Sequence, residues 1–279
     1  MTDLEPIFAT IAVDQAGAQN QFNKVIKAAL IKSYEFLNAA VEMQDDHVFF
    51  VMPFLRGVCE DYIALKFIAS NLGSDSDQVI ELKLQDELYT SAIAQWNFYG
   101  TYRPNQILYY QANFPDIQTE VRRDLRQICK VHGINLSKNQ YFPNVRYMAE
   151  RSDLLELYKY VYHATSSLVH FSPRILSRMG WGDLPDITFS VKHFSQYYKH
   201  FICFYGAYLL VQLSQWAIGI DLVTPAIQSH IQSLHTILTE QARWPELVTF
   251  EEMNIGGDSR VHRFHSPASN ATAHQNDPV

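Results

Sequence analysis

Apolar residues recur at steps of three and four through most of the chain, the spacing that places them on one side of an α-helix. In the segment QFNKVIKAALIKSYEFLNAAVEM this spacing puts six apolar residues on one stripe: Phe22, Ile26, Ala29, Leu30, Tyr34 and Leu37. No segment alternates apolar and polar residues for long enough to predict a sheet. The pattern therefore predicts an all-α protein.

The same spacing, together with capping residues, predicts the remaining helices. They cover 47–73, 74–100, about 119–131, a short stretch near Pro143, 152–171, an apolar segment that ends near Gly219, and 224–240. Ser152 is the predicted N-cap of the helix over 152–171, and Pro173 marks the break beyond its end. We expect a single bundle of about seven to eight helices, forming one domain over 1–245.

From about Phe250 the composition changes to Asn, Ser, Gly, His and Ala, with few large apolar residues. Such a segment buries too little surface to offset the entropy cost of ordering it, so 246–279 is predicted to be a flexible tail. The tail contains His262, His265 and His274. Without cysteines or carboxylates at ligand spacing, these histidines do not predict a metal site.

The apolar segment FICFYGAYLLVQLSQWAIGI, residues 201–220, has the length of a membrane span. Gln212, Ser214 and Gln215 interrupt it, and its tyrosine and tryptophan residues lie in its middle, whereas a span keeps them near its ends. We therefore expect a buried core helix and no membrane association.

Charge and cysteine content narrow the class of protein further. The net charge of −7 argues against a broadly basic nucleic-acid surface, although a local cationic groove is compatible with it, and no DNA partner is expected. Cys59, Cys129 and Cys203 form no CxxC pair, which predicts reduced thiols. The N-terminus lacks the basic start and apolar run of a signal peptide. Together these features predict a cytoplasmic protein.

Two predicted helices carry polar residues at positions where the helical period predicts core. In LRGVCEDY, Arg56 and Glu60 are four residues apart and share one side of the helix, between apolar neighbours. Charges that become buried must be paired or otherwise satisfied. A structural ion pair and a role in a functional site both fit this pattern.

The second such helix contains VYHATSSLVHFSP. Six polar residues form two neighbouring stripes along it: Tyr158, Tyr162, Ser166 and His170 on one, His163 and Ser167 on the other. If this side of the helix packs against the side that carries Arg56 and Glu60, the combined groups suit acid–base chemistry or the binding of an anion. A core polar network that determines how the helices pack fits the same pattern.

Other motifs are weak. The chain has no glycine-rich phosphate loop, no HExxH and no nucleophile elbow. Arg126 and His132 have five residues between them, which falls within the Arg-x(4–6)-His spacing of HEPN ribonucleases. Two residue types at a loose spacing also recur by chance in a chain with 11 histidines.

Two segments resemble the hallmarks of a large bacterial family of unknown function. FLRGVCEDYIALKFIA is similar to its Arg-x3-Glu helix, with Arg56 and Glu60 at the matching positions. YFPNVRYMAERSDLLELYKYVYHATSSLVHFSP is similar to its second hallmark, a run of two tyrosines, a serine and a valine–histidine pair. The resemblance implies an all-α fold that is loosely similar to HEPN-type proteins, which include toxin and antiphage ribonucleases. One departure is that His170 has no arginine four to six residues before it.

Two functions follow as expectations. In the first, a HEPN-like helical protein acts on RNA or a nucleotide in prokaryotic antiphage defence, as a ribonuclease that needs no metal or other cofactor. His170 is then the general acid/base, Arg56 stabilises the phosphorane and Glu60 orients Arg56. The substrate contacts are Tyr158, Tyr162, His163, Ser166 and Ser167. In the second, a non-catalytic binding protein uses the same residues to hold a small anion or as a core network. A homodimer is compatible with both.

Overall fold

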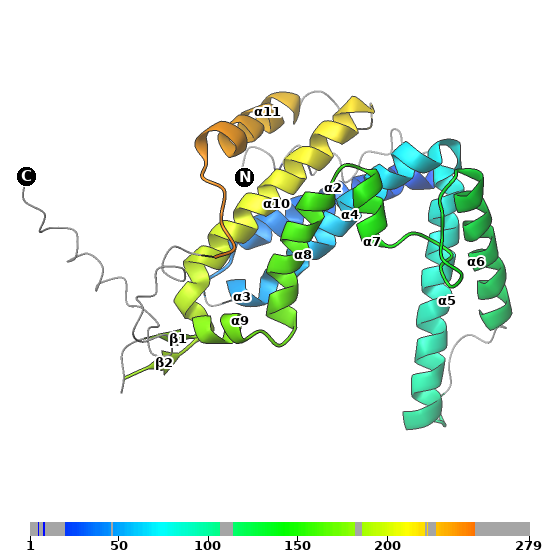
Figure 1. Cartoon of the computed structure of the whole chain (residues 1–279), viewed down its shortest axis with the longest axis horizontal. Helices are drawn as coiled ribbons and strands as arrows, with labels where there is room; N and C mark the ends of the chain where they lie inside the picture. Colours follow the sequence, from blue (N-terminus) through cyan, green and yellow to red (C-terminus); the bar gives the residue numbers. More distant parts are fainter. Residues whose placement is uncertain are drawn as a thin grey trace, which may run out of the picture. The chain divides into compact units, whose positions relative to one another are not determined.

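The described part of the chain is mostly helical (Figure 1). The computed structural model describes residues 5, 8, 20–45, 47–106, 114–181, 186–220, 222 and 227–248. A short antiparallel hairpin pairs β1 (Gly180–Trp181) with β2 (Thr188–Phe189), and two-residue strands do not change the fold class. The predicted all-α class is confirmed, whereas the predicted tail beyond Val248 lies outside the described residues.

The helices agree with the apolar periodicity of the sequence. In chain order they are α2 (Gln21–Glu42), α3 (Val48–Val51), α4 (Phe54–Leu72), η1 (Gly73–Asp75), α5 (Ser76–Tyr102), α6 (Phe114–Val131), α7 (Val145–Arg151), α8 (Leu155–Val169), α9 (Pro173–Arg178), η2 (Val191–Phe194), α10 (Ser195–Gly219), α11 (Gln228–Thr236) and a π-helical turn (Ile237–Gln241).

Three predicted boundaries were wrong. The helix expected over 47–73 is divided into α3 and α4 at Pro53, because proline lacks an N–H donor and its ring clashes with the preceding turn. Ser152 is the C-cap of α7 and not the N-cap of α8, which begins one turn later, after Asp153 with a φ of 57°. Helix α6 starts at Phe114, five residues before the predicted Thr119, since a proline is tolerated in the first helical turn.

The chain divides into two compact units, which we describe separately. Unit 1 comprises Met1–Ala12, Ala29–Cys59 and Lys159–Val279, and unit 2 comprises Val13–Ala28 and Glu60–Tyr158.

Helix α10 forms the core of unit 1. Fourteen of its residues are buried, among them Phe201, Ile202 and Leu210. Gly206 allows α2 to approach, because a Cβ atom at this position would lie 3.1 Å from the Phe36 ring. The stretch from Val191 to Gly219 is long and apolar enough to cross a membrane by length and composition, but 67% of its most apolar window is buried within the fold. That burial is the property of a core helix, as predicted.

Residues 244–247, here called the C-terminal strap, are held in unit 1 through their backbone carbonyls. The Tyr160 and Tyr205 hydroxyls donate to the Pro245 carbonyl at 2.7 and 3.1 Å. The Tyr197 hydroxyl donates to the Glu246 carbonyl at 2.7 Å. Arg174 and Arg178 each donate to the Leu247 carbonyl at 2.8 Å. The expected boundary between domain and tail, at 245/246, therefore falls inside an anchored segment.

Arg178 is the buried cation among these donors, with 5% of its surface exposed. Its guanidinium carbon lies 5.2, 4.7 and 5.9 Å from the ring centroids of Phe194, Tyr197 and Tyr198, so aromatic faces surround the charge. Burial raises the pKa of the Tyr197 phenol, which the adjacent Arg178 partly offsets. Burial likewise raises the pKa of Tyr205, so both phenols remain neutral donors to the strap.

In unit 2, helices α5 and α6 lie side by side (Figure 1). A polar network around the buried Asp86 joins them. The Arg122 Nε donates to the Asp86 carboxylate at 2.6 Å, and the Gln118 amide donates to the same oxygen at 3.2 Å. Gln118 also donates to the Thr90 hydroxyl at 2.7 Å. The Arg122 guanidinium lies 4.6 Å from the Tyr141 ring centroid, which connects the network to the loop after α6. Burial and then the neighbouring Asp86 raise the pKa of Tyr141.

The strap predicts a sharp dependence of stability on where the chain is truncated. Truncation after Val248 should leave the melting temperature nearly unchanged. Truncation after Arg243 removes the carbonyls to which Arg178, Tyr197 and Tyr205 donate. Each buried donor left without an acceptor should lower the free energy of unfolding by about 1–3 kcal/mol. Differential scanning calorimetry should then show a melting temperature lower by about 5 °C or more. Equal melting temperatures for the two truncated proteins would contradict a structural role for the strap.

The α5–α6 network predicts a strongly destabilising substitution. Asp86→Ala removes the carboxylate that pairs with Arg122 and accepts from Gln118, and it should lower the free energy of unfolding by about 3–5 kcal/mol in urea titrations. Asp124→Ala is the matched control: its pair with Arg123 is exposed, so its loss should cost less than about 1 kcal/mol. Similar losses for the two variants would show that burial of Asp86 does not matter.

Candidate functional site

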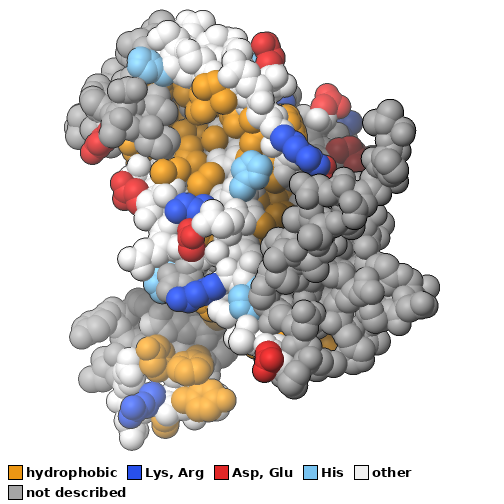
Figure 2. Space-filling view, turned by 90° about the vertical axis from the view of Figure 1, so that its left-hand side faces the viewer, with side chains coloured by type: hydrophobic (Ala, Val, Ile, Leu, Met, Phe, Trp, Pro, Cys, Tyr) orange, Lys and Arg blue, Asp and Glu red, His pale blue; other side chains and the backbone are white. Residues whose placement is uncertain are grey.

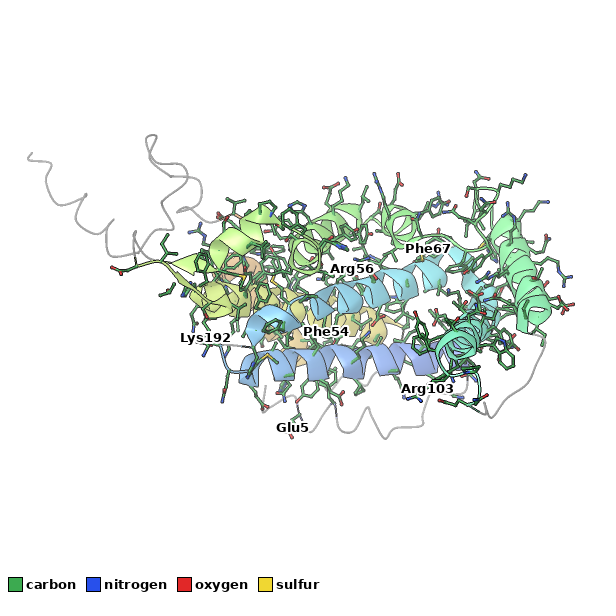
Figure 3. The ribbon with its side chains drawn as sticks, turned by 90° about the horizontal axis from the view of Figure 1, so that it is seen from below. Glu5, Phe54, Arg56, Phe67, Arg103 and Lys192 are labelled. Carbon is green, nitrogen blue, oxygen red and sulfur yellow. The ribbon has the colours of Figure 1, made fainter. Side chains whose placement is uncertain are left out.

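The predicted contact between the Arg56 helix and the His170 helix is present in unit 1. Arg56 lies in the first turn of α4 (Figure 3), and its guanidinium carbon is 4.4 Å from the centroid of the Tyr162 ring on α8. A guanidinium over a phenol ring at this distance forms a cation–π contact. Both side chains are partly exposed, so the contact is at the surface of the unit.

Two histidines, one on α8 and one directly after its last residue, do not point into the core. His163 and His170 are both exposed, whereas Val161, Ala164 and Thr165 form the buried side of the helix. The helical period predicted core positions for this polar side, and that prediction was wrong for the histidines. The period of the helix places Tyr162, His163 and His170 within about 100° of arc, on the side away from the buried residues. This exposed side, with Lys159 and Ser166, is the α8 surface.

The two serines of α8 lie between its buried and its exposed side. Ser167 is half-buried and its hydroxyl donates to the Ala164 carbonyl of the same helix at 3.0 Å. Ser166 is also half-buried, and its backbone carbonyl accepts from the His170 N–H at 3.0 Å. The Ser167 hydroxyl is thus engaged with its own helix backbone, whereas an activated nucleophile is bonded to a base.

Spacing along α8 separates the groups that were expected to act on one phosphate. Tyr162, which Arg56 covers, is eight residues before His170, a rise of about 12 Å along the helix axis. His163 and His170 are about 10 Å apart by the same measure. Glu60 and Tyr158 are half-buried and belong to unit 2, one helical turn from Arg56 and Tyr162 in sequence. The α8 surface is thus an elongated strip and not a single point of convergence.

Arg126 and His132, whose spacing matches the HEPN pattern, both have structural partners in unit 2. The Arg126 guanidinium donates to the backbone carbonyls of Ser137, Lys138 and Gln140, and so holds the loop after α6. The His132 Nε2 lies 2.8 Å from the Asp75 carboxylate. These contacts give both residues a structural role. They favour the interpretation that the Arg126–His132 spacing matches the HEPN pattern by chance.

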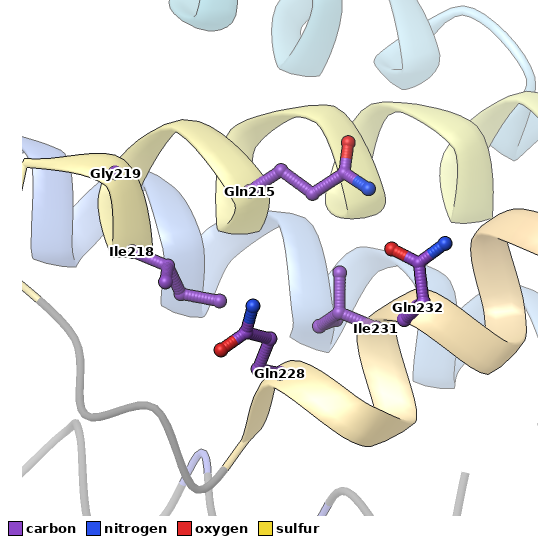
Figure 4. Close-up of a pocket in the computed structure, with 6 residues that line it drawn as sticks. All are labelled: Gln215, Ile218, Gly219, Gln228, Ile231 and Gln232. Atoms are coloured by element: carbon purple, nitrogen blue, oxygen red, sulfur yellow. The ribbon is translucent and has the colours of Figure 1, made fainter.

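A separate hollow in unit 1 lies between the end of α10 and α11 (Figure 4). Its lining combines three amides with apolar groups: Gln215, Ile218, Gly219, Gln228, Ile231 and Gln232. A lining without titratable groups provides no acid, base or charge. It therefore does not compete with the α8 surface as a candidate for catalysis.

Sequence reasoning missed the Asp86 network and the strap. Asp86 is part of no recognisable sequence motif, and its partners Gln118 and Arg122 lie on another helix. The strap is held by backbone carbonyls, which leave no residue-specific signal in a sequence. The three cysteines are free thiols, as expected, and burial raises the pKa of Cys129 to about 11. Among the described residues, no group of three or more His, Cys, Asp or Glu side chains is placed to hold a metal ion.

Comparison with known proteins identifies the family but no characterised relative. Residues 14–186 match a family of unknown function, DUF5677. No curated protein matches the chain, and no solved structure does. The matched span includes α4 and α8, the helices whose hallmarks the sequence showed, and it ends before α10. Because the match covers more than half of the chain, the protein belongs to the DUF5677 family.

Proposed function

We propose that the protein binds an RNA strand along the α8 surface and cleaves it without a metal ion. The observation that carries the proposal is the Arg56 guanidinium, held 4.4 Å from the Tyr162 ring beside a strip that exposes His163 and His170. A cation, an aromatic ring and imidazoles in a row offer charge for phosphates and a flat face for bases. The strip from Lys159 to His170 rises about 16 Å, longer than one phosphate group requires.

In the proposed reaction, His170 acts on the phosphodiester at one end of the strip. Its imidazole accepts the proton of the ribose 2′-hydroxyl as the 2′-oxygen attacks phosphorus. The bond from phosphorus to the 5′-oxygen then breaks, and the proton passes to that oxygen. Arg56 lies over Tyr162, which is about 12 Å from His170 along α8, and so contacts another phosphate of the strand and not the reacting one. This assignment differs from the sequence-based expectation, and it gives no role to Glu60 or Tyr158, which belong to unit 2.

The resemblance to HEPN-type proteins and a role in prokaryotic antiphage defence are part of this proposal. The all-α fold and the membership of a family of unknown function are compatible with both. The cytoplasmic location expected from the sequence is also part of this proposal.

A second candidate is a non-catalytic interaction protein. Its specific support is the apolar exposure at the end of unit 1 that carries α9 and the β1–β2 hairpin, where Figure 2 shows hydrophobic side chains gathered at the surface. Phe171, next to His170, is 85% exposed, and Val169, Leu176 and Phe189 are also exposed. Exposed aromatic residues of this kind suit a protein partner as well as a stacked base.

Substitutions on the α8 surface separate the two candidates. His170→Ala should reduce cleavage of a labelled single-stranded RNA at least about tenfold, in buffer with a metal chelator, while leaving RNA affinity within about threefold. Arg56→Ala should weaken binding about fivefold or more, as measured by fluorescence anisotropy. Because His170 is exposed, its removal should change the free energy of unfolding by less than about 1 kcal/mol. A wild-type protein that neither binds nor cleaves RNA would contradict the first candidate. The non-catalytic interaction protein would then be the remaining candidate.

Arg126→Ala tests whether the HEPN-like spacing has a function of its own. The substitution removes hydrogen bonds to loop carbonyls and should cost about 1–3 kcal/mol of stability in urea titrations. Cleavage per folded molecule should match that of the wild type. Loss of cleavage from a protein that stays folded would move the active site from α8 to α6.

A further inference from the structure

Helix α5 carries a stripe of exposed side chains at coiled-coil spacing. Its members follow one another at steps of four, three, four, three and four residues: Leu84, Leu88, Ser91, Gln95, Phe98 and Tyr102. All six are exposed, and the four large apolar ones are each more than half exposed. The Phe98 and Tyr102 ring centroids are 4.8 Å apart, so the aromatic part of the stripe is continuous. We call these six residues the α5 seam.

The seam lies on the side of α5 away from α6. The residues of α5 that bond to α6 are Asp86 and Thr90, which accept from Gln118 and Arg122. At about 100° per residue, both point roughly opposite to the seam, whose six members fall within about 80° of arc. Among the described residues of unit 2, α6 thus covers one side of α5 and leaves the seam open (Figure 1).

The spacing specifies a helix as the occupant of the seam. Apolar residues at alternating steps of three and four are the a and d positions of a heptad, which insert between the side chains of a facing helix. A globular core needs a wider apolar face, and a lipid surface needs a cationic rim. Between Glu87 and Arg103 the helix has no charged residue. A chain of net charge −7 can therefore bring two copies of this seam together without placing like charges against each other.

We propose that the occupant is the α5 seam of a second copy, packed antiparallel about a two-fold axis near Ile93. With that axis, Leu84 faces Tyr102, Leu88 faces Phe98, and Ser91 faces Gln95. Apolar residues then meet apolar residues, and the two polar residues meet each other in the centre, as a self-complementary two-fold interface requires. Every layer pairs an a position with a d position, and the opposed helix dipoles attract each other. A parallel arrangement aligns the dipoles and places Ser91 against Ser91.

The size of the seam predicts a reversible dimer. Half-exposed leucine and aromatic side chains contribute on the order of 100 Å² each, so two seams bury roughly 800–1,000 Å² in total. Interfaces of this size are at the weak end of specific association. We therefore expect a dissociation constant in the micromolar range, independent of whether the protein acts on RNA.

The oligomeric state of the full chain tests the proposal. Sedimentation velocity between about 1 and 200 µM should show a shift from monomer to dimer for the wild type. Leu88→Glu places two charges in the seam and should raise the dissociation constant at least about tenfold, while circular dichroism shows that the helix content is kept. Asn97→Glu adds the same charge to an exposed position off the seam and should dimerise normally. A wild type that is monomeric at all concentrations, or a Leu88→Glu protein that dimerises normally, overturns the proposal.

Disulfide trapping tests the antiparallel arrangement. Ser91→Cys and Gln95→Cys proteins, mixed and oxidised, should form a covalent dimer, because facing a and d positions bring the two Cα atoms within about 7 Å. Each variant alone should stay monomeric on a non-reducing gel, as should the wild type with its native cysteines. A covalent dimer from Ser91→Cys alone would instead show a parallel pair and overturn the arrangement.

Discussion

A charged group can be buried in a protein only where its hydrogen-bonding atoms find partners, and both units of this chain are organised around such a group. In unit 1 the buried Arg178 is surrounded by three aromatic rings and bonded to the strap. In unit 2 the buried Asp86 joins α5 to α6 through Arg122 and Gln118. The partners of each charge come from segments far apart in sequence, so satisfying the charge also determines which segments meet.

The same constraint distinguishes charged residues with a structural role from exposed residues that can contact a ligand. The buried ionic groups Arg178 and Asp86 are bonded to partners within the fold. Arg126 and His132, partly exposed, are likewise engaged with a loop and with Asp75. The α8 surface differs, because its imidazoles are exposed and its aromatic ring has a cation held over one face. The exposed imidazoles of His163 and His170 are accessible to a ligand, which is why the proposed function is built there.

The two open surfaces differ in chemistry and belong to different units. The α8 surface mixes cation, imidazole and aromatic groups, whereas the α5 seam is uncharged and follows a strict heptad. A polyanion matches the first and a helix matches the second. Dimerisation through α5 leaves α6 and its network unaltered, since α6 occupies the opposite side of the helix.

The sequence by itself determined the helices, because a period of 3.6 residues is a local property that each segment carries alone. It also determined the core role of α10 and the break at Pro173. It placed Arg56 and Tyr162 on the helices that meet, and it named His163 and His170. Only the tertiary structure decided that these histidines face outward, since a periodic stripe does not say which side its neighbours cover. The same holds for the partners of Asp86, Arg126 and His132, which lie tens of residues away or are backbone atoms. The strap could not be predicted because its bonded groups are backbone atoms. Every residue has a carbonyl, so no side-chain pattern marks the three carbonyls that Arg174, Arg178 and the tyrosines bind.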